Sequence, residues 1–188
     1  METVLILDFG AQYSQLIARR VREQNVYCEV KPCSISPAEI EKIAPIGIIL
    51  SGGPQSVYES VSLRVDPALF ALGIPVLGIC YGCQLMAYSL GGTVAAATEA
   101  TAREYGKTLT EFDTHSAIFQ DLPASSVTWM SHGDYISRVP DGFTVTAKTA
   151  VCPTAAMACP EKRLYGVQFH PEVQHTVEGS EMLRRFLY

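Results

Sequence analysis

Short apolar runs alternate with amphipathic stretches through residues 1–90, and this alternation limits the possible folds more than any other feature of the sequence. We expect buried strands and intervening helices, with strands at 4–7, 27–31, 47–50 and 76–79, and helices at 14–24, 37–44, from 66 onward and at 82–90. Buried strands that alternate with helices are typical of a parallel sheet covered on both faces. The sequence therefore predicts an α/β fold with a doubly wound, mostly parallel sheet, whose ligands bind at the carboxyl ends of the strands.

The pattern changes after Gly92 to shorter and more polar runs. We expect antiparallel strands there, as an added sheet or edge, near 104–112, 127–130, 143–149, 154–159 and 164–169. A closing helix is expected at 178–187. Because neither a linker nor an internal repeat divides the chain, we expect one domain over residues 1–188.

Charge and cysteine content exclude several classes of protein. The net charge is −5 and basic residues cluster only as the arginine pairs 19/20 and 184/185, which argues against a nucleic-acid surface. Six irregularly spaced cysteines favour free thiols in a cytoplasmic protein. The uncharged stretch from Pro67 to Thr98 is long enough to span a bilayer, but Pro75 and the Gly91–Gly92 pair divide it, so we expect no membrane span.

The stretch GICYGCQL has two incompatible interpretations. Cys80 and Cys83 have the spacing of a thiol oxidoreductase or of half a zinc site, whereas Gly78, Cys80 and Gly82 have the spacing of a nucleophile elbow. In an elbow, the start of the following helix favours a thiolate, and the Tyr81 N–H points to where an oxyanion would form. Zinc has little support, because the chain has no second CxxC and no HxxxH.

A base for such a thiol is available in YGVQFHPEV. His170 follows a predicted strand and is therefore expected on the same rim of the sheet as Cys80. Residues i and i+2 of an extended chain share a face, so Glu172 can hold one imidazole nitrogen while the other faces the thiol. These residues together predict a Cys-His-Glu set suited to acyl transfer.

The stretch SGGPQS follows the third predicted strand. It is superficially like the SGGxDS phosphate loop of ATP pyrophosphatases, but Pro54 lacks an N–H group and Gln55 replaces the acid, so phosphate binding is not favoured. We expect instead that the N–H of Gly53 is a second oxyanion donor, opposite that of Tyr81. DFGAQY lacks the full GxGxxG pattern, so no dinucleotide cofactor is expected.

Taken together, the motifs resemble those of the class I glutamine amidotransferases. LILDFGAQYSQLIARRVRE, SGGPQSVY, GICYGCQLMA, MSHGDYI and YGVQFHPEV occur in that family's order across the whole chain. DFGAQYSQLIARR and SHGDY are similar to the branch that serves GMP synthesis. The resemblance implies a flavodoxin-like fold with added antiparallel strands, and hydrolysis of the glutamine side-chain amide through a γ-glutamyl thioester, with release of glutamate and ammonia.

The resemblance also assigns roles to residues. It makes Cys80 the nucleophile, His170 the base and Glu172 the acid that orients it. The oxyanion N–H groups come from Gly53 and Tyr81, and glutamine is held by Gly52, Gln84, Ser131, His132 and Gly133, with no metal. Cys83 departs from the family, in which this position is more often apolar, such as methionine, and the resemblance implies that Cys83 packs as a small hydrophobic residue.

The implied partner is an ATP pyrophosphatase (synthetase) domain or subunit, which uses the ammonia to aminate xanthosine monophosphate (XMP). ATP and Mg²⁺ are expected in that partner, and no cofactor is expected in this chain. Two alternatives of other classes remain open: a thiol oxidoreductase that uses Cys80 and Cys83, and a catalytically silent regulatory module with the same fold.

Overall fold

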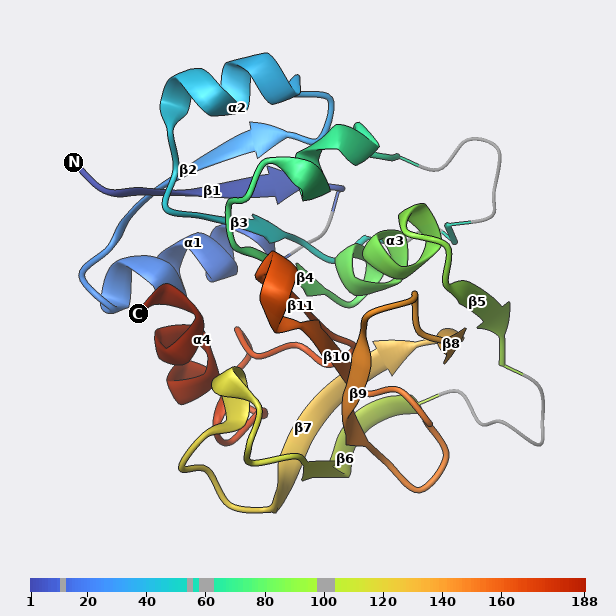
Figure 1. Cartoon of the computed structure of the whole chain (residues 1–188). Coiled ribbons are helices and arrows are strands. Elements are labelled where there is room, and N and C mark those ends of the chain that lie inside the picture. The colour runs from blue at the N-terminus through green and yellow to red at the C-terminus, as the bar shows by residue number, and fades with distance from the viewer. Residues whose placement is uncertain (11–12, 54–55, 58–62, 98–103) are drawn as a thin grey trace.

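A large twisted sheet forms the centre of the molecule in a computed structural model, which describes residues 1–188 except 11–12, 54–55, 58–62 and 98–103 (Figure 1). Its strand order is β2-β1-β3-β4-β11-β10-β9-β6-β7. The strands are β1 (Thr3–Asp8), β2 (Tyr27–Pro32), β3 (Gly47–Leu50), β4 (Val76–Ile79), β6 (Glu104–Phe112), β7 (Ser125–His132), β9 (Thr144–Lys148), β10 (Ala156–Cys159) and β11 (Leu164–Val167). A separate two-stranded ribbon pairs β5 (Thr93–Ala96) with β8 (Asp134–Arg138).

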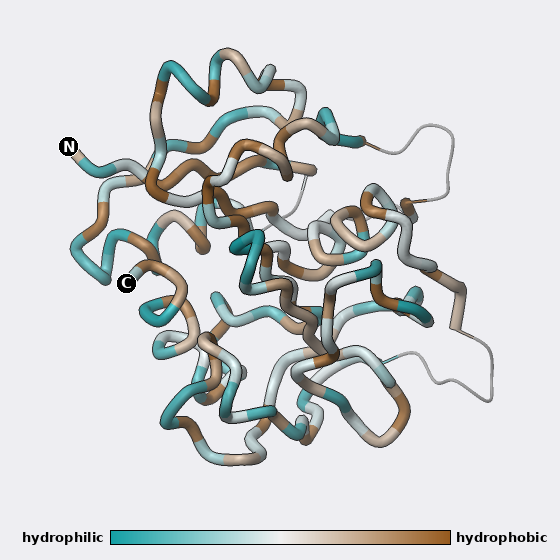
Figure 2. The backbone as a smooth tube through the Cα atoms, viewed as in Figure 1, coloured by the Kyte–Doolittle hydropathy of each residue, from teal (hydrophilic) through white to brown (hydrophobic). Residues whose placement is uncertain are grey.

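The parallel part of this sheet consists of β2, β1, β3, β4 and β11. Alternate residues of β1 enter two different hydrophobic clusters, with Leu5 and Leu7 in one and Val4 and Ile6 in the other. Both faces are therefore buried, as the apolar runs predict. The central strands accordingly include some of the most hydrophobic segments of the backbone (Figure 2).

Helices cover both faces of the parallel strands. α1 (Ser14–Glu23) and α4 (Gly179–Leu187) contribute residues such as Ile17 and Leu183 to one cluster. α2 (Pro37–Ile43) and α3 (Tyr81–Ser89) contribute to the other. The helix expected from residue 66 is a short 3₁₀ helix (Pro67–Ala71), whose first turn is capped by the Asp66 side chain. The doubly wound α/β prediction is confirmed.

The second half of the chain corrects the prediction in two respects. β6, β7, β9 and β10 are antiparallel as expected, but β11 pairs in parallel with β4, so the strand before His170 belongs to the parallel part of the sheet. The β5–β8 ribbon was not predicted. Only Gly133 separates β7 from β8, and β5 (TVAA) is short and only partly buried, so neither was distinguished as a separate strand.

The long uncharged stretch that begins at Pro67 is divided among a 3₁₀ helix, β4, α3 and β5. In the part of the chain that the structure describes, no helix has the length and apolar character needed to cross a bilayer.

The topology brings three segments to one edge of the sheet. β3, β4 and β11 are parallel neighbours, so the residues that follow them, at 51–53, 80–81 and 168–172, emerge side by side. The end of β7 joins them, because the N–H of His170 donates to the carbonyl oxygen of Trp129 at 3.0 Å. This edge is the carboxyl end of the parallel strands, where the fold class places its ligands.

Candidate active site

Cys80 occupies a strained turn between β4 and α3, with φ 54° and ψ −109°. Positive φ is costly for a residue with a side chain, so the surrounding structure must enforce it. A methyl group on Gly78 would lie 2.6 Å from the carbonyl oxygen of Gly82, and one on Gly82 would overlap the backbone of Leu50. The two glycines of GxCxG are therefore required for the turn that exposes Cys80 to the rim of the sheet.

Cys83 lies on the other side of the sheet from Cys80. Its side chain is fully buried in the hydrophobic cluster that contains Leu5 and Leu7, and it packs against Gly166. Burial, followed by the charges of Cys80 and Cys152, raises the pKa of the Cys83 thiol well above its usual range. All six cysteines lie among the described residues and are free thiols. This placement agrees with a packing role for Cys83 and not with a redox pair.

His170 and Glu172 form a buried pair beside Cys80. His170 Nδ1 lies 2.7 Å from Glu172 Oε1, and the two side chains are 6% and 0% exposed. Burial acts to lower the pKa of His170, but the hydrogen bond to Cys80, that to Glu172 and the charges of both partners outweigh it and raise the pKa to about 11. The structure therefore favours an imidazolium placed between the cysteine and the carboxylate.

Gly52 allows this arrangement to form. A methyl group at this position would lie 3.2 Å from Cε1 of His170 and 3.6 Å from Cβ of Cys80. Any larger side chain would push the imidazole away from the thiol. Gly52 was predicted to bind glutamine, but among the described residues it lies against His170 and does not line the pocket.

The backbone around the His170–Glu172 pair is held by bonds that the sequence did not reveal. Thr176 Oγ1 donates to the carbonyl oxygen of His170 at 2.6 Å, and Arg20 Nε donates to that of Glu172 at 2.9 Å. Glu172 Oε2 is buried and has no hydrogen-bond partner among the described residues. Because a buried charge needs compensation, His170 is the group that balances this carboxylate.

A pocket of about 350 Å³ opens in front of Cys80. It is lined by Gly53, Ser56, Cys80, Tyr81, Gln84, Tyr105, Ser131, His132, Gly133 and Asp134. The structure thus brings together the two residues predicted as oxyanion donors and all but one of those predicted to hold glutamine. Ser56, Tyr105 and Asp134 were not predicted: Ser56 and Asp134 lie within the SGGPQS and MSHGDYI motifs but were given no role there, and Tyr105 lies in no motif. Pro54 and Gln55, on which the comparison with phosphate loops depended, lie outside the described residues.

A chain of side-chain amides leads from the pocket wall to the sulfur. Gln84 Nε2 donates to the carbonyl oxygen of Asp134 at 3.1 Å and to Gln168 Oε1 at 3.0 Å. A carbonyl oxygen can only accept, so these bonds fix which way both amides point. The amide nitrogen of Gln168 then faces Cys80 Sγ at 3.7 Å. Gln168 is fully buried and was not singled out from the sequence, although it lies within the YGVQFHPEV motif.

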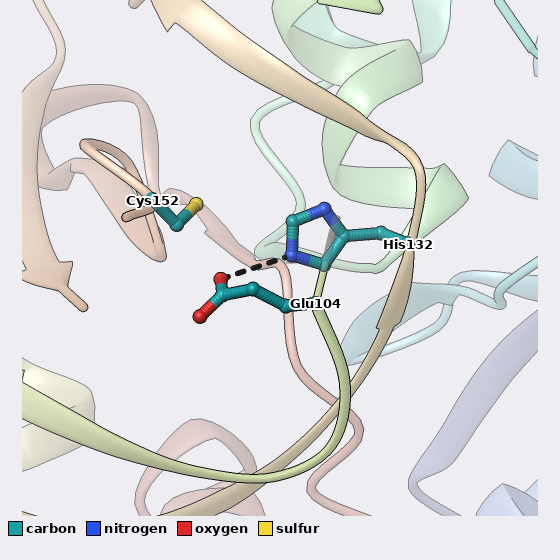
Figure 3. Close-up of side chains that lie close together, drawn as sticks. All are labelled: Glu104, His132 and Cys152. Carbon is teal, nitrogen blue, oxygen red and sulfur yellow. Dashed lines mark hydrogen bonds and ion pairs between the residues drawn. The ribbon is translucent and has the colours of Figure 1, made fainter. Parts of the chain in front are cut away.

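A second group of ionisable side chains lies behind the pocket wall (Figure 3). Glu104 and His132 face each other across β6 and β7, and Glu104 Oε1 lies 3.2 Å from His132 Nε2. Cys152, from the loop between β9 and β10, completes the group, and burial together with the charge of Glu104 raises the pKa of its thiol to about 12. One donor atom from each residue lies within 4.8 Å of the others, and the described residues contain no other such metal-compatible trio.

Comparison with known proteins identifies the family of this chain. The family model described as "Glutamine amidotransferase class-I" matches residues 5–188. Proteins named "GMP synthase [glutamine-hydrolyzing]" are 55% identical in Clostridium botulinum strain Alaska E43 and 54% identical in Bacillus pumilus. Each match covers the whole of this chain and 36% of the relative, so the chain spans about a third of these proteins.

Solved structures of similar proteins also match this chain over nearly its full length. The structure of a putative GMP synthase protein from Thermoplasma acidophilum superposes with a TM-score of 0.86 at 31% identity, covering 100% of this chain and 92% of that one. A glutamine amidotransferase of Thermotoga maritima, at 21% identity and a TM-score of 0.78 over 99% of this chain and 96% of that one, shows the same fold. From the family match over nearly its full length, the chain belongs to the class I glutamine amidotransferase family.

Proposed function

We propose that this chain hydrolyses L-glutamine to glutamate and ammonia through a thioester on Cys80. The observation that carries the proposal is the line of groups Cys80–His170–Glu172 at the edge of a pocket. A cysteine in a strained elbow faces an imidazole whose pKa is raised by hydrogen bonds to both neighbours. An imidazole held between a thiol and a carboxylate is the arrangement that activates a sulfur nucleophile.

In this reaction Cys80 Sγ attacks the side-chain amide carbon of glutamine. The oxyanion that forms accepts hydrogen bonds from the N–H groups of Gly53 and Tyr81, which both line the pocket beside Cys80. One such donor contributes about 3–4 kcal/mol to the transition state. His170 gives its proton to the departing ammonia, then takes a proton from the water that hydrolyses the thioester, while Glu172 keeps the ring oriented.

The remaining pocket residues are suited to the amino-acid head of glutamine. Because the Gln84 amide nitrogen is occupied by Asp134 and Gln168, its oxygen is the atom left to accept from the substrate ammonium group. The backbone of Ser131, His132 and Gly133 forms the adjoining wall. Neutral hydrogen bonds of this kind each contribute about 0.5–1.5 kcal/mol, so the head orients the substrate more than it tightens binding.

The ammonia is proposed to supply a synthetase domain or subunit that uses ATP and Mg²⁺ to aminate XMP to GMP in the cytoplasm. The name of the relatives, and the 36% of their length that this chain covers, support this assignment. Ammonia made without a waiting acceptor is lost, so a site that reaches full activity only with a loaded partner avoids wasting glutamine. Such a coupling between sites amounts to about 1–3 kcal/mol.

The test is steady-state glutamate release at saturating glutamine by the purified chain, with and without a matching synthetase supplied with ATP and XMP. We expect slow release by the chain alone and a rise of roughly 5- to 150-fold with the loaded partner. The partner alone and the Cys80→Ala chain are the controls. Full turnover by the isolated chain, unchanged by a bound and active partner, would contradict the coupling but not the hydrolysis.

The same assay distinguishes the two alternatives. A thiol oxidoreductase requires Cys83 as well as Cys80 and a measurable reduction potential for the pair, which the burial of Cys83 argues against. A silent module would release no glutamate with or without the partner, and Cys80 would not react with a covalent glutamine analogue.

A further inference from the structure

The three side chains of the cluster Glu104–His132–Cys152 lie close together (Figure 3), and each has a hydrogen-bond partner outside the cluster. Cys152 Sγ donates to the carbonyl oxygen of Thr154 at 3.4 Å. His132 Nδ1 lies 2.7 Å from the carbonyl oxygen of Asp134, and Glu104 Oε2 accepts from Thr149 Oγ1 at 2.9 Å. A backbone carbonyl behind a histidine and a hydroxyl behind a carboxylate are typical outer partners of metal ligands. All three side chains are buried.

The hydrogen bonds also show which atoms face the centre of the cluster. The Asp134 oxygen can only accept, so Nδ1 of His132 carries a proton, and Nε2 is the ring nitrogen that faces the cluster. Nε2 lies 3.2 Å from a Glu104 carboxylate oxygen, which is an acceptor. The two atoms can therefore be joined either by a proton on Nε2 or by a cation that both of them bind.

We propose that Glu104, His132 and Cys152 bind a thiophilic divalent cation of the Zn²⁺ class. Zinc takes nitrogen and oxygen at about 2.0–2.2 Å and thiolate sulfur at about 2.3 Å, which puts its donors about 3.3–3.7 Å apart. The donor atoms here lie within 4.8 Å of one another, so the widest separation would shorten by up to about 1 Å on binding. Imidazole, carboxylate and thiolate together suit zinc, whereas Mg²⁺ and Ca²⁺ prefer oxygen ligands alone. Binding replaces the Cys152 S–H bond with a sulfur–metal bond, and the proton leaves to solvent.

The site would connect the glutamine pocket to a loop that is distant in sequence. His132 lines the pocket between Ser131 and Gly133, and Cys152 lies in a turn fixed by its N–H bond to Thr149 Oγ1 at 2.9 Å. A cation would therefore hold the pocket wall against the β9–β10 connection. This role is separate from the chemistry at Cys80 and does not depend on it.

The test uses Co²⁺ as a coloured substitute for Zn²⁺, in the Cys80→Ser protein so that the thiol of the elbow cannot bind the metal. We expect a near-ultraviolet sulfur-to-cobalt charge-transfer band at one equivalent, which Zn²⁺ abolishes. Cys152→Ser should remove the band and weaken Co²⁺ binding by at least about 10- to 100-fold. Cys159→Ser is the matched control, because Cys159 is an equally buried thiol outside the cluster, and it should keep the band.

Glu104→Gln in the same background provides a second variant, which should also weaken Co²⁺ binding, and circular dichroism verifies that each variant is folded. If the Cys152 variant does not fold, two other results support the site: Glu104→Gln no longer binds Co²⁺, and Zn²⁺ raises the melting temperature of the Cys80→Ser parent but not that of Glu104→Gln. No sulfur-to-cobalt band in the folded parent protein, or a band that survives Cys152→Ser, would overturn the proposal and leave a proton between His132 and Glu104.

Discussion

Two buried histidine–glutamate pairs lie near the same pocket and differ in how the second ring nitrogen is used. In the first pair, His170 Nδ1 is 2.7 Å from Glu172, and the ring also bonds to Cys80. In the second, His132 Nε2 is 3.2 Å from Glu104, and Nδ1 is committed to the carbonyl oxygen of Asp134. Residue type and burial are the same in both.

We therefore propose that position, and not residue type, separates the pair that serves catalysis from the pair that supports the pocket. His170 can exchange a proton because its second partner is a titratable thiol at the pocket edge. His132 cannot do so through Nδ1, because a backbone carbonyl neither gives nor takes a proton. We therefore expect changes in the first pair to act on turnover, and changes in the second to act mainly on glutamine binding.

The largest effect should come from removing the thiol that distinguishes the first pair. Cys80→Ala leaves no atom to form the thioester, so we expect glutamate release to fall by about 10⁵- to 10⁶-fold, to background. Cys83→Ala is the matched control and should stay within a few fold of wild type, because Cys83 lies on the other side of the sheet. Equal loss in both variants would restore the redox-pair interpretation.

Removing the His170 imidazole should lower the turnover number more than altering the Glu172 carboxylate that orients it. We expect His170→Ala to lower the turnover number by roughly 10⁴-fold or more, and Glu172→Gln to lower it less, since the acid only orients the ring and balances its charge. Glu104→Gln is the comparison in the second pair and should raise the KM for glutamine with a smaller change in turnover. A larger turnover loss in Glu104→Gln than in Glu172→Gln would reverse the comparison.

The titration of His170 sharpens the same contrast. Its pKa is raised from the ordinary 6.5 to about 11, so the imidazolium should persist through neutral pH and be lost as the pH rises toward 11. The imidazolium's contribution to the stability of the fold is complete below pH 6.5 and is lost as the pH rises from 6.5 through about 11. In Glu172→Gln the pKa should fall, since the negative charge is removed and the amide oxygen offers only a neutral hydrogen bond. Ring-nitrogen NMR of labelled His170 measures both values, and an unchanged pKa would contradict the assignment.

The smallest effect is expected at Gln168, which touches the sulfur from the side. Gln168→Leu removes the amide that faces Cys80 Sγ at 3.7 Å, and a hydrogen bond of this kind contributes about 0.5–1.5 kcal/mol. We expect the reaction of Cys80 with iodoacetamide at neutral pH to be slower by up to roughly tenfold, and partial recovery in Gln168→Asn. Thermal stability should change similarly in both variants. A difference between them in the rate of Cys80 alkylation therefore shows that Gln168 positions the sulfur and does not act only through packing.

The sequence predicted the parts of the molecule that depend on local patterns. The apolar runs gave the parallel strands, and the glycines flanking Cys80 gave the elbow, because steric overlap at these positions allows little else. The spacing of His170 and Glu172 predicted their pairing correctly, although residues 171–172 form a turn and not the extended segment that was expected. Each of these features is set by residues close together in the chain.

Several features that depend on distant residues were not predicted. The parallel pairing of β11 with β4 joins segments about ninety residues apart, as does the bond between Gln168 and Cys80. The Glu104–His132–Cys152 cluster likewise forms only after β6, β7 and the β9–β10 loop come together. Polar residues without a motif signal nothing until the fold places them side by side.

The most direct test of the central claim, that the His170–Glu172 pair serves Cys80 as the nucleophile, is covalent labelling with a diazoketone analogue of glutamine followed by mass mapping. The account predicts a single label on Cys80, formed much more slowly in His170→Ala and prevented by excess glutamine. A label on any other cysteine, Cys152 included, or equal labelling rates in wild type and His170→Ala, would contradict it.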